Sequence, residues 1–196
     1  MMTEKARIAV LVSGGGTNLQ ALLDAQQSGV LRSGEIVLVV SNNSKAYALE
    51  RAAKAGVETA VRKGPTFEDD LRVLLKQYRI DLIILAGFMR ILSEGFTSEW
   101  PNRILNVHPS LIPAFCGKGY YGLRVHEEAL RRGVKVTGAT VHFVNEIPDG
   151  GEIILQKAVD VLPGDTPEQL QRRVMEQAEW ILLPQAAELV SKGVKA

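Results

Sequence analysis

The chain has 196 residues, of which 46% are hydrophobic, and this size and composition fit one globular domain with a full hydrophobic core. Its 23 basic and 22 acidic side chains give a formal charge of +1, which argues against a nucleic-acid partner because such partners need a concentrated basic face. The single cysteine, Cys116, excludes an internal disulfide and fits a reducing compartment, so we expect a cytoplasmic protein. The first residues lack the apolar core of a secretory signal, and no apolar run reaches the length of a membrane span, so we expect neither.

Strand and helix patterns alternate along the first half of the chain. Five short runs predict strands at 8–12, 36–40, 59–61, 82–86 and 104–107. Apolar residues at helical spacing predict helices near 19–23, at 47–55 and near 67–75. Strand runs that are apolar on both faces are typical of strands covered by helices on both sides, and hence of a parallel sheet.

The pattern changes in the second half of the chain. We expect a helix at 122–132, followed by strands at 134–144 and 153–161 that a hairpin-like connection makes antiparallel. Thr166 and Pro167 form a starting sequence for a last helix, which Pro184 should kink or break. Because no repeat, linker or boundary is found, we predict a single α/β domain over 1–196. Its sheet should be doubly wound, mostly parallel but mixed, with helices on both faces.

A glycine-rich loop joins the first predicted strand to the first predicted helix. Ser13 is followed by three glycines, after which Thr17 and Asn18 add side-chain donors. Glycines allow a ligand close to the backbone, and a helix start offers unpaired N–H groups and the positive end of the helix dipole. The loop therefore suits a monophosphate. It lacks the lysine of a P-loop, and Leu19 stands where a dinucleotide fingerprint has its third glycine. A glycine-rich turn capped by Thr17 is an equally acceptable interpretation.

An amide and an imidazole, Asn106 and His108, lie two residues apart at the end of the fifth predicted strand. Strand side chains alternate between faces, so these two point to the same side, at the edge where the glycine loop and segment 87–92 should also meet. Together they can donate hydrogen bonds to one oxyanion. Asp149, in a later loop, would orient His108 and favour its protonated form. We interpret the trio as a site for acyl chemistry without a metal or a covalent enzyme intermediate, although each residue alone also fits a structural role.

Other candidate residues fit structural roles better. Cys116 has no histidine and acid fixed beside it in the sequence, so we interpret it as a bystander. His126, on an expected helix, should be solvated. His142, on the polar side of a strand, should make a structural hydrogen bond, with a supporting role near the site left open. Three scattered histidines and one cysteine show no metal-ligand spacing, so no metal is expected.

Four segments in chain order closely resemble the motifs of the phosphoribosylglycinamide formyltransferase family, which is folate-dependent and serves purine biosynthesis. They are Ser-Gly-Gly-Gly-Thr-Asn-Leu-Gln at 13–20, Ala-Gly-Phe-Met-Arg-Ile-Leu at 86–92, Asn-Val-His-Pro-Ser-Leu-Ile-Pro at 106–113 and Asp-Gly-Gly-Glu-Ile-Ile-Leu-Gln at 149–156. Related formyl-transferring and formyl-hydrolysing enzymes share the Asn-x-His and Asp part. The resemblance implies a Rossmann-type formyltransferase domain that moves a formyl group from 10-formyltetrahydrofolate to the amine of glycinamide ribonucleotide.

The resemblance also implies roles for individual residues. The catalytic residues implied are Asn106, His108 and Asp149, the last raising the pKa of the histidine. The residues implied for the ribonucleotide and its phosphate are Gly16, Thr17, Asn18 and Glu179. The residues implied for the folate are Arg62, Met89, Arg90, Ile91, Leu92, Asn106, Asn145, Glu146, Ile147, Pro148 and Asp149.

The chain departs from the family's pattern at three places. Gly64 stands where many members carry a cation for the folate, and Arg62 is the substitute we assign. On the final helix the usual Glu-His pair reads Glu-Trp at 179–180, and the interval from Arg173 is one residue longer. The loop 116–121 is also longer than in many relatives, and it fits either a lid or an interface element.

Other functions stay open on the sequence alone. A formyltetrahydrofolate hydrolase would share Asn106, His108 and Asp149, although such hydrolases usually carry a regulatory domain in front, for which we expect no room here. A non-catalytic phosphate- or nucleotide-binding module would bind ligands through 14–18 without turnover. A related transferase acting on initiator transfer RNA fits neither the length nor the charge. The expected partners are small molecules, with no nucleic acid and no membrane, and the expected assembly is a monomer or a homodimer.

Overall fold

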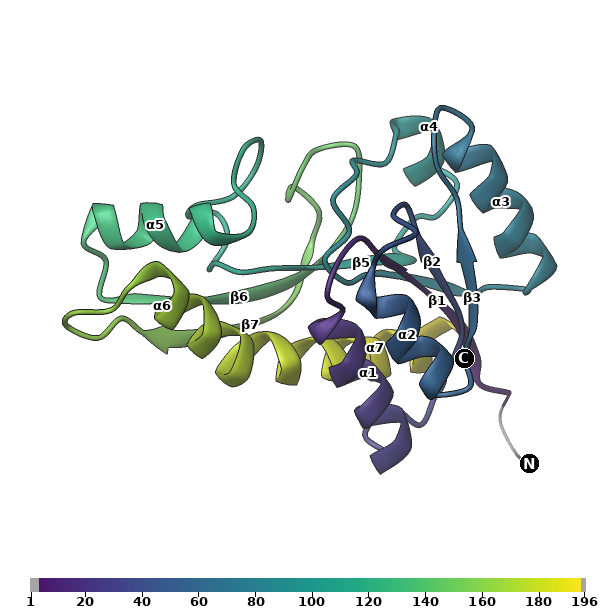
Figure 1. Ribbon diagram of the computed structural model, residues 1–196, viewed down its shortest axis with the longest axis horizontal. Coiled ribbons are helices and arrows are strands. Elements are labelled where there is room, and N and C mark those ends of the chain that lie inside the picture. Colours follow the sequence, from purple (N-terminus) through teal and green to yellow (C-terminus); the bar gives the residue numbers. More distant parts are fainter. Residues whose placement is uncertain (1–3, 195–196) are drawn as a thin grey trace.

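The computed structural model describes residues 4–194 as one seven-stranded sheet in the order β3-β2-β1-β4-β5-β6-β7 (Figure 1). β1 to β5 are parallel, whereas β6 is antiparallel to β5 and β7 is antiparallel to β6. The predicted mixed, doubly wound sheet is confirmed. The strands are β1 (Ala6–Val12), β2 (Gly34–Ser41), β3 (Glu58–Val61), β4 (Leu82–Leu85), β5 (Ile104–His108), β6 (Val136–Phe143) and β7 (Ile153–Asp160).

Every helix expected from the sequence has a counterpart, and one short helix was not anticipated. This extra helix is α4, which begins after Ser93, whose hydroxyl accepts a hydrogen bond from the Phe96 N–H. The helices are α1 (Thr17–Ser28), α2 (Tyr47–Lys54), α3 (Phe67–Gln77), α4 (Glu94–Thr97), α5 (Leu123–Arg132), α6 (Pro167–Val174), the π-helical turn η1 (Met175–Glu179) and α7 (Trp180–Val194).

Helices cover both faces of the sheet, and each face has its own apolar core. One core packs α1, α2, α6 and α7 against one side of the strands, with Leu105 and Val107 of β5 among its buried residues. The other packs α3 and α4 against the opposite side, on which Ile104 of β5 lies. Because strand side chains alternate, Asn106 and His108 face the same side as Ile104. The two polar residues therefore lie on the face covered by α3 and α4, at the end of β5.

The final helical segment excludes one of the two outcomes expected at Pro184, a break. Thr166 and Gln169 form a reciprocal capping box at its start, as the Thr-Pro sequence indicated. The segment is not broken at Pro184, which lies inside α7, and the irregularity comes earlier, at η1. A proline in a helix interior costs about 3 kcal/mol. Buried apolar side chains on both sides of it, including Leu183 and Ala187, outweigh that cost because each contributes about 1 to 3 kcal/mol.

The carboxyl ends of the parallel strands bring distant segments to one edge of the sheet. From β1 the chain first winds outwards through β2 to β3, and it then returns to β4 on the other side of β1 and continues to β5. The direction of winding therefore changes between β1 and β4. Ligands of such sheets bind at this change of direction. Within residues 4–194, no helix is long and apolar enough to cross a membrane.

Candidate active site

β5 ends in the amide and imidazole that the sequence placed on one face. Asn106 is half-buried and His108 is buried. The loop between β6 and β7 starts after Phe143, which lies opposite Leu105. The loop then turns back along β5, which places Asp149 Oδ2 3.5 Å from His108 Nδ1. The structure thus brings the three predicted catalytic side chains together.

His142 is a fourth member of this group. The sequence predicted a structural hydrogen bond for it and left a supporting role near the site open. It lies directly opposite Asn106 across the β5–β6 pair, so the two side chains share a face. Its Nε2 lies 3.2 Å from Asn106 Nδ2 and 3.5 Å from Asp149 Oδ1, and its Nδ1 lies 2.7 Å from the Phe143 carbonyl oxygen. With Nδ1 donating to that carbonyl, a neutral ring accepts from the amide and fixes its orientation. We call Asn106, His108, His142 and Asp149 the β5 cluster.

Main-chain groups of the loop after β5 hold the cluster from the other side. The Phe115 carbonyl lies 2.8 Å from His108 Nε2, which must donate because a carbonyl oxygen only accepts. The Gly117 N–H donates to Asp149 Oδ2 at 2.8 Å. Cys116 lies between them, and burial together with the negative charge of Asp149 raises the pKa of its thiol. A raised thiol pKa disfavours a nucleophile, which supports the bystander interpretation.

Opposing effects set the charges of the cluster. Burial alone would raise the pKa of Asp149, but the neighbouring His142 side chain, the charge of His108 and the Gly117 N–H together lower it. For His108 burial prevails and lowers its pKa, although Asp149 and the Phe115 carbonyl act in the opposite direction. The expectation that Asp149 raises the pKa of His108 is therefore right for that one interaction and wrong for the sum. Burial therefore favours the neutral form of His108.

His126 corrects a second expectation. It was expected to be solvated, yet it is fully buried on α5, and neither ring nitrogen has a hydrogen-bond partner within residues 4–194. The reason is the inward stripe of the helix, which His126 shares with Val125 and Ala129. Burial, together with the charge of the nearby His108, lowers the pKa of His126 to about 4.

The glycine loop opens directly into α1. Gly16 has a φ of 74°, and no side chain in the described chain caps the first turn, so the interpretation as a turn capped by Thr17 is wrong. Uncapped N–H groups at a helix start suit an anion. The loop also reaches the neighbouring segment 87–92, because Ser13 Oγ accepts a hydrogen bond from the Met89 N–H at 2.8 Å.

Asn18, in the first turn of α1, is joined to the final helical segment. Its Nδ2 donates to Glu179 Oε2 at 2.8 Å, and both residues are buried. Burial raises the pKa of Glu179 to about 7, although the bond from Asn18 acts in the opposite direction. Asn18 Oδ1 is buried without a hydrogen-bond partner within residues 4–194. A donor on a bound ligand would satisfy this acceptor.

The residues of segment 87–92 divide by exposure. Met89 and Ile91 are exposed, at 59% and 72%, so their side chains are free to contact a ligand. Leu92 is only 5% exposed and packs into the core beneath α3 and α4. Any contact from Leu92 to a folate must therefore come from its main chain.

Two cations implied for the folate lie on segments that touch. Arg90 Nη1 donates to the Gly64 carbonyl at 2.8 Å, and its guanidinium lies 4.9 Å from the centre of the Phe67 ring. Arg62 is half-buried, and its Nη1 donates to the Val61 carbonyl at 2.8 Å. The Arg90 side chain thus contacts the main chain two residues after Arg62.

The loop that carries Asp149 presents most of its side chains to solvent. The exposed ones are Glu146, Ile147 and Pro148. Asn145 Oδ1 accepts the Ile147 N–H at 3.0 Å and starts the turn. A Cβ at Gly151 would collide with the Phe143 carbonyl oxygen, so only glycine lets the loop close tightly after Asp149. Within residues 4–194 no three His, Cys, Asp or Glu side chains group as a metal site would require.

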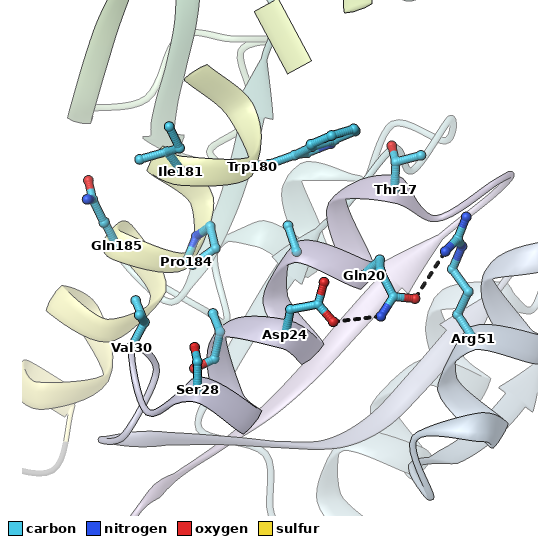
Figure 2. Close-up of a pocket in the computed structure, with 12 residues that line it drawn as sticks. Thr17, Gln20, Asp24, Ser28, Val30, Arg51, Trp180, Ile181, Pro184 and Gln185 are labelled. Carbon is cyan, nitrogen blue, oxygen red and sulfur yellow. Dashed lines mark hydrogen bonds between the residues drawn. The ribbon is translucent and has the colours of Figure 1, made fainter. Parts of the chain in front are cut away.

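A separate groove of about 610 Å³ lies between α1 and α7 (Figure 2). Thr17 and Trp180 flank one end, and Val30 and Gln185 lie at the other. No residue of the β5 cluster lines it. The groove begins at the start of α1, beside the glycine loop, so it is next to the implied phosphate site and apart from the implied site of chemistry.

Comparison with protein families decides the relationship that these features suggest. The family model described as formyl transferase matches residues 6–186, which is most of the chain. The chain belongs to the formyl transferase family. The glycine loop, the β5 cluster and the last helical segment up to residue 186 all lie within the matched part.

Three individual relatives illustrate this family membership. Phosphoribosylglycinamide formyltransferase of Haemophilus influenzae is 40% identical over 95% of this chain and 88% of its own. The solved structure of glycinamide ribonucleotide transformylase 1 from Symbiobacterium toebii has a TM-score of 0.89 and 43% identity, covering 98% of this chain and 94% of its own. The human trifunctional purine biosynthetic protein adenosine-3 is 44% identical over 97% of this chain, which spans only 19% of that longer protein.

The π turn explains how this formyl transferase accommodates its unusual interval between Arg173 and Glu179. A π turn holds one residue more than the α-helical turn it replaces. η1 covers Met175–Glu179, within the interval that we expected to be one residue longer than the family's pattern. A turn of this kind has room for one extra residue, and Glu179 faces Asn18 here.

Proposed function

We propose that the protein transfers the formyl group of 10-formyltetrahydrofolate to the amine of glycinamide ribonucleotide, in purine biosynthesis. The carrying observation is the β5 cluster, in which Asp149 lies 3.5 Å from both His108 and His142 while His142 lies 3.2 Å from Asn106. The names of the bacterial relatives support the choice of ribonucleotide, and formyl transferases of this family take a formyl-folate as co-substrate.

In the proposed reaction the ribonucleotide amine attacks the formyl carbon directly. A C–N bond forms, and the formyl oxygen becomes an oxyanion that accepts a hydrogen bond from the Asn106 amide. The attacking nitrogen must lose a proton, and Nδ1 of neutral His108 can take it because Nε2 carries the ring proton towards the Phe115 carbonyl. Protonated His108, stabilised by Asp149, then supports the oxyanion. The bond to N10 of the folate breaks as that nitrogen leaves with the proton, which gives formylglycinamide ribonucleotide and tetrahydrofolate.

The proposed binding sites surround this cluster. The ribonucleotide phosphate binds the N–H groups at Gly16, Thr17 and Asn18, and Glu179 contacts the ribonucleotide. The folate lies along Met89, Arg90, Ile91 and the Leu92 main chain, with Arg62 nearby and its pterin against the 145–149 loop. The exposure of Met89 and Ile91 and the unpaired Asn18 Oδ1 support this arrangement.

The test is steady-state formyl transfer by wild type, His108→Ala and Asn106→Ala, with both substrates present. We expect each substitution to lower kcat by about a hundred- to a thousandfold, the usual effect of removing one oxyanion donor. Thermal unfolding of each variant shows whether the fold survives. Full activity in His108→Ala would reject the role of this histidine, and release of formate at an equal rate without ribonucleotide would instead indicate a hydrolase.

A further inference from the structure

Helix α2 is hydrogen-bonded to two successive carbonyls of the glycine loop. The Ala48 N–H donates to the Gly14 carbonyl at 3.1 Å, and Arg51 Nε donates to the Gly15 carbonyl at 2.8 Å. The helix also packs against the loop closely, since a Cβ at Gly16 would lie 2.6 Å from the Ala48 Cβ. The conformation of the loop is therefore set by α2 as well as by its own glycines.

These two hydrogen bonds determine the direction in which the N–H groups of the loop point. In a trans peptide the carbonyl of one residue and the N–H of the next point in opposite directions. Because α2 and Arg51 hold the carbonyls of Gly14 and Gly15, the N–H groups of Gly15 and Gly16 are turned away from α2. Within residues 4–194 neither of these N–H groups donates a hydrogen bond. Two adjacent, similarly directed N–H groups form an anion-binding concavity.

Arg51 is itself held rigidly. Its Nη1 donates to Gln20 Oε1 at 3.0 Å, and Gln20 Nε2 donates in turn to Asp24 Oδ1 at 2.9 Å (Figure 2). Its guanidinium also lies 5.0 Å from the centre of the Tyr47 ring. The guanidinium thus bridges the loop, α1 and α2. A planar fork with several donors can make these contacts together, whereas the single ammonium of lysine cannot.

We propose that Arg51 is a positioning residue for the ribonucleotide phosphate, which fixes the Gly15 carbonyl so that the Gly15 and Gly16 N–H groups face the anion. This inference rests on the proposed function for the identity of the substrate. Arg51 lies on α2, whereas the β5 cluster lies on β5, β6 and their loops. Its loss therefore weakens binding of the phosphate-bearing substrate and leaves the chemical step intact.

The first experiment compares Arg51→Met and Arg51→Lys with wild type in formyl transfer. We expect Arg51→Met to raise the KM for glycinamide ribonucleotide about tenfold, as loss of one hydrogen bond to a charged group does, with kcat within about twofold. The KM for 10-formyltetrahydrofolate should not change. Arg51→Lys should restore part of the loss, because it keeps the charge and one donor.

Lys54→Met is the matched control. Lys54 is a cation on the same helix, 5.6 Å from the same Tyr47 ring, and no hydrogen bond joins it to the glycine loop within residues 4–194. We expect this variant to keep the wild-type KM and kcat. An equal effect from Lys54→Met would show that the KM depends on the net charge of α2 rather than on the hydrogen bond from Arg51 to the Gly15 carbonyl. A lower kcat with an unchanged KM in Arg51→Met would also overturn the proposal.

A second measurement separates this inference from the proposed function. Ribose 5-phosphate is titrated calorimetrically into wild type and Arg51→Met, which requires no formyl transfer. About tenfold weaker binding by a variant with unchanged thermal unfolding supports the positioning role even if the enzyme uses another phosphorylated amine. Equal binding by the two proteins refutes it. Failure of wild type to formylate glycinamide ribonucleotide would refute the proposed function alone.

Discussion

A buried imidazole with a low pKa makes the protein sensitive to acid. His126 is fully buried, and its pKa is lowered to about 4, whereas an unfolded chain would give it the ordinary value of about 6.5. A histidine with a depressed pKa contributes stability that is fully present above pH 6.5 and is lost as pH falls towards 4, because the unfolded chain binds the proton first.

We therefore predict that His126→Leu, which has a similar volume and no ionisable group, resists acid better than wild type. Its free energy of unfolding relative to wild type should rise by on the order of 2 kcal/mol between pH 7 and pH 4. Urea titrations at several pH values measure this difference. A difference that stays constant with pH would mean that His126 does not titrate as a buried group.

At this scale the sequence predicted some residues better than others. Asn106 and His108 were placed on one face by strand alternation alone. His126 was misjudged because the packing that encloses α5 comes from other elements. The hydrogen bond predicted for His142 is present, but its partner Asn106 was not foreseen because the two meet through the β5–β6 register. The net pKa of His108 was also missed, because burial depends on the whole fold and outweighs the one carboxylate that the motif supplies.

Among the elements, the π-helical turn η1 is the most unusual, and its position between two buried helical segments has a testable consequence. A π turn sacrifices regular helical hydrogen bonding, so it persists where the flanking segments must stay in register. Here Leu170 and Val174 before the turn and Leu182 and Leu183 after it are all buried in one core. Holding both flanks in place leaves the extra residue no position except in the turn.

We predict that deleting Gln177, an exposed residue of η1, converts the π turn into α-helix without moving Glu179 away from Asn18. The KM for the ribonucleotide and the thermal unfolding temperature should stay close to wild type. Deleting Gln185, an exposed residue of α7, is the matched control. It should rotate the following residues by about 100° and destabilise the protein strongly. If both deletions destabilised equally, η1 would not be absorbing an extra residue.

Element boundaries were predictable where a local signal marks them. The Thr166 capping box and the glycine after α5 are such signals, and both ends were predicted. The effect of Pro184 was not, because a local rule foresees the lost hydrogen bond but not the core packing on both sides of it. The order of the strands in the sheet could not be predicted from local sequence patterns either, because it depends on which strand each crossover connection reaches.

For the whole molecule, stability depends on two buried groups that respond to pH in opposite senses. The pKa of Glu179 is raised to about 7, whereas an unfolded chain gives about 4.5. A carboxyl group of this kind contributes stability that is fully present below pH 4.5 and is lost as pH rises through about 7. His126 acts in the reverse direction over much of the same range, so the two effects partly cancel between pH 4.5 and 6.5.

We predict that Glu179→Gln, whose amide oxygen still accepts the bond from Asn18, removes the loss at neutral pH. Its stability relative to wild type should increase by on the order of 2 kcal/mol between pH 4.5 and pH 8. Thermal and urea unfolding across this range measure the change. A relative stability that falls with rising pH would show that Glu179 is ionised in the folded protein and stabilised by its surroundings.

The contacts from Phe115 and Gly117 to the β5 cluster have an evolutionary consequence. Both come from the main chain, so the loop delivers them whatever side chains it carries, provided that the backbone path is kept. Point changes at Cys116, Lys118, Tyr120 and Tyr121 should therefore accumulate freely among descendants of this chain, whereas Gly117 and Gly119, with φ of 85° and 90°, should stay glycine. An insertion or deletion between His108 and Phe115 would shift both partners at once, whereas a change of length after Gly117 would leave both in place, so relatives should vary in loop length only beyond this residue.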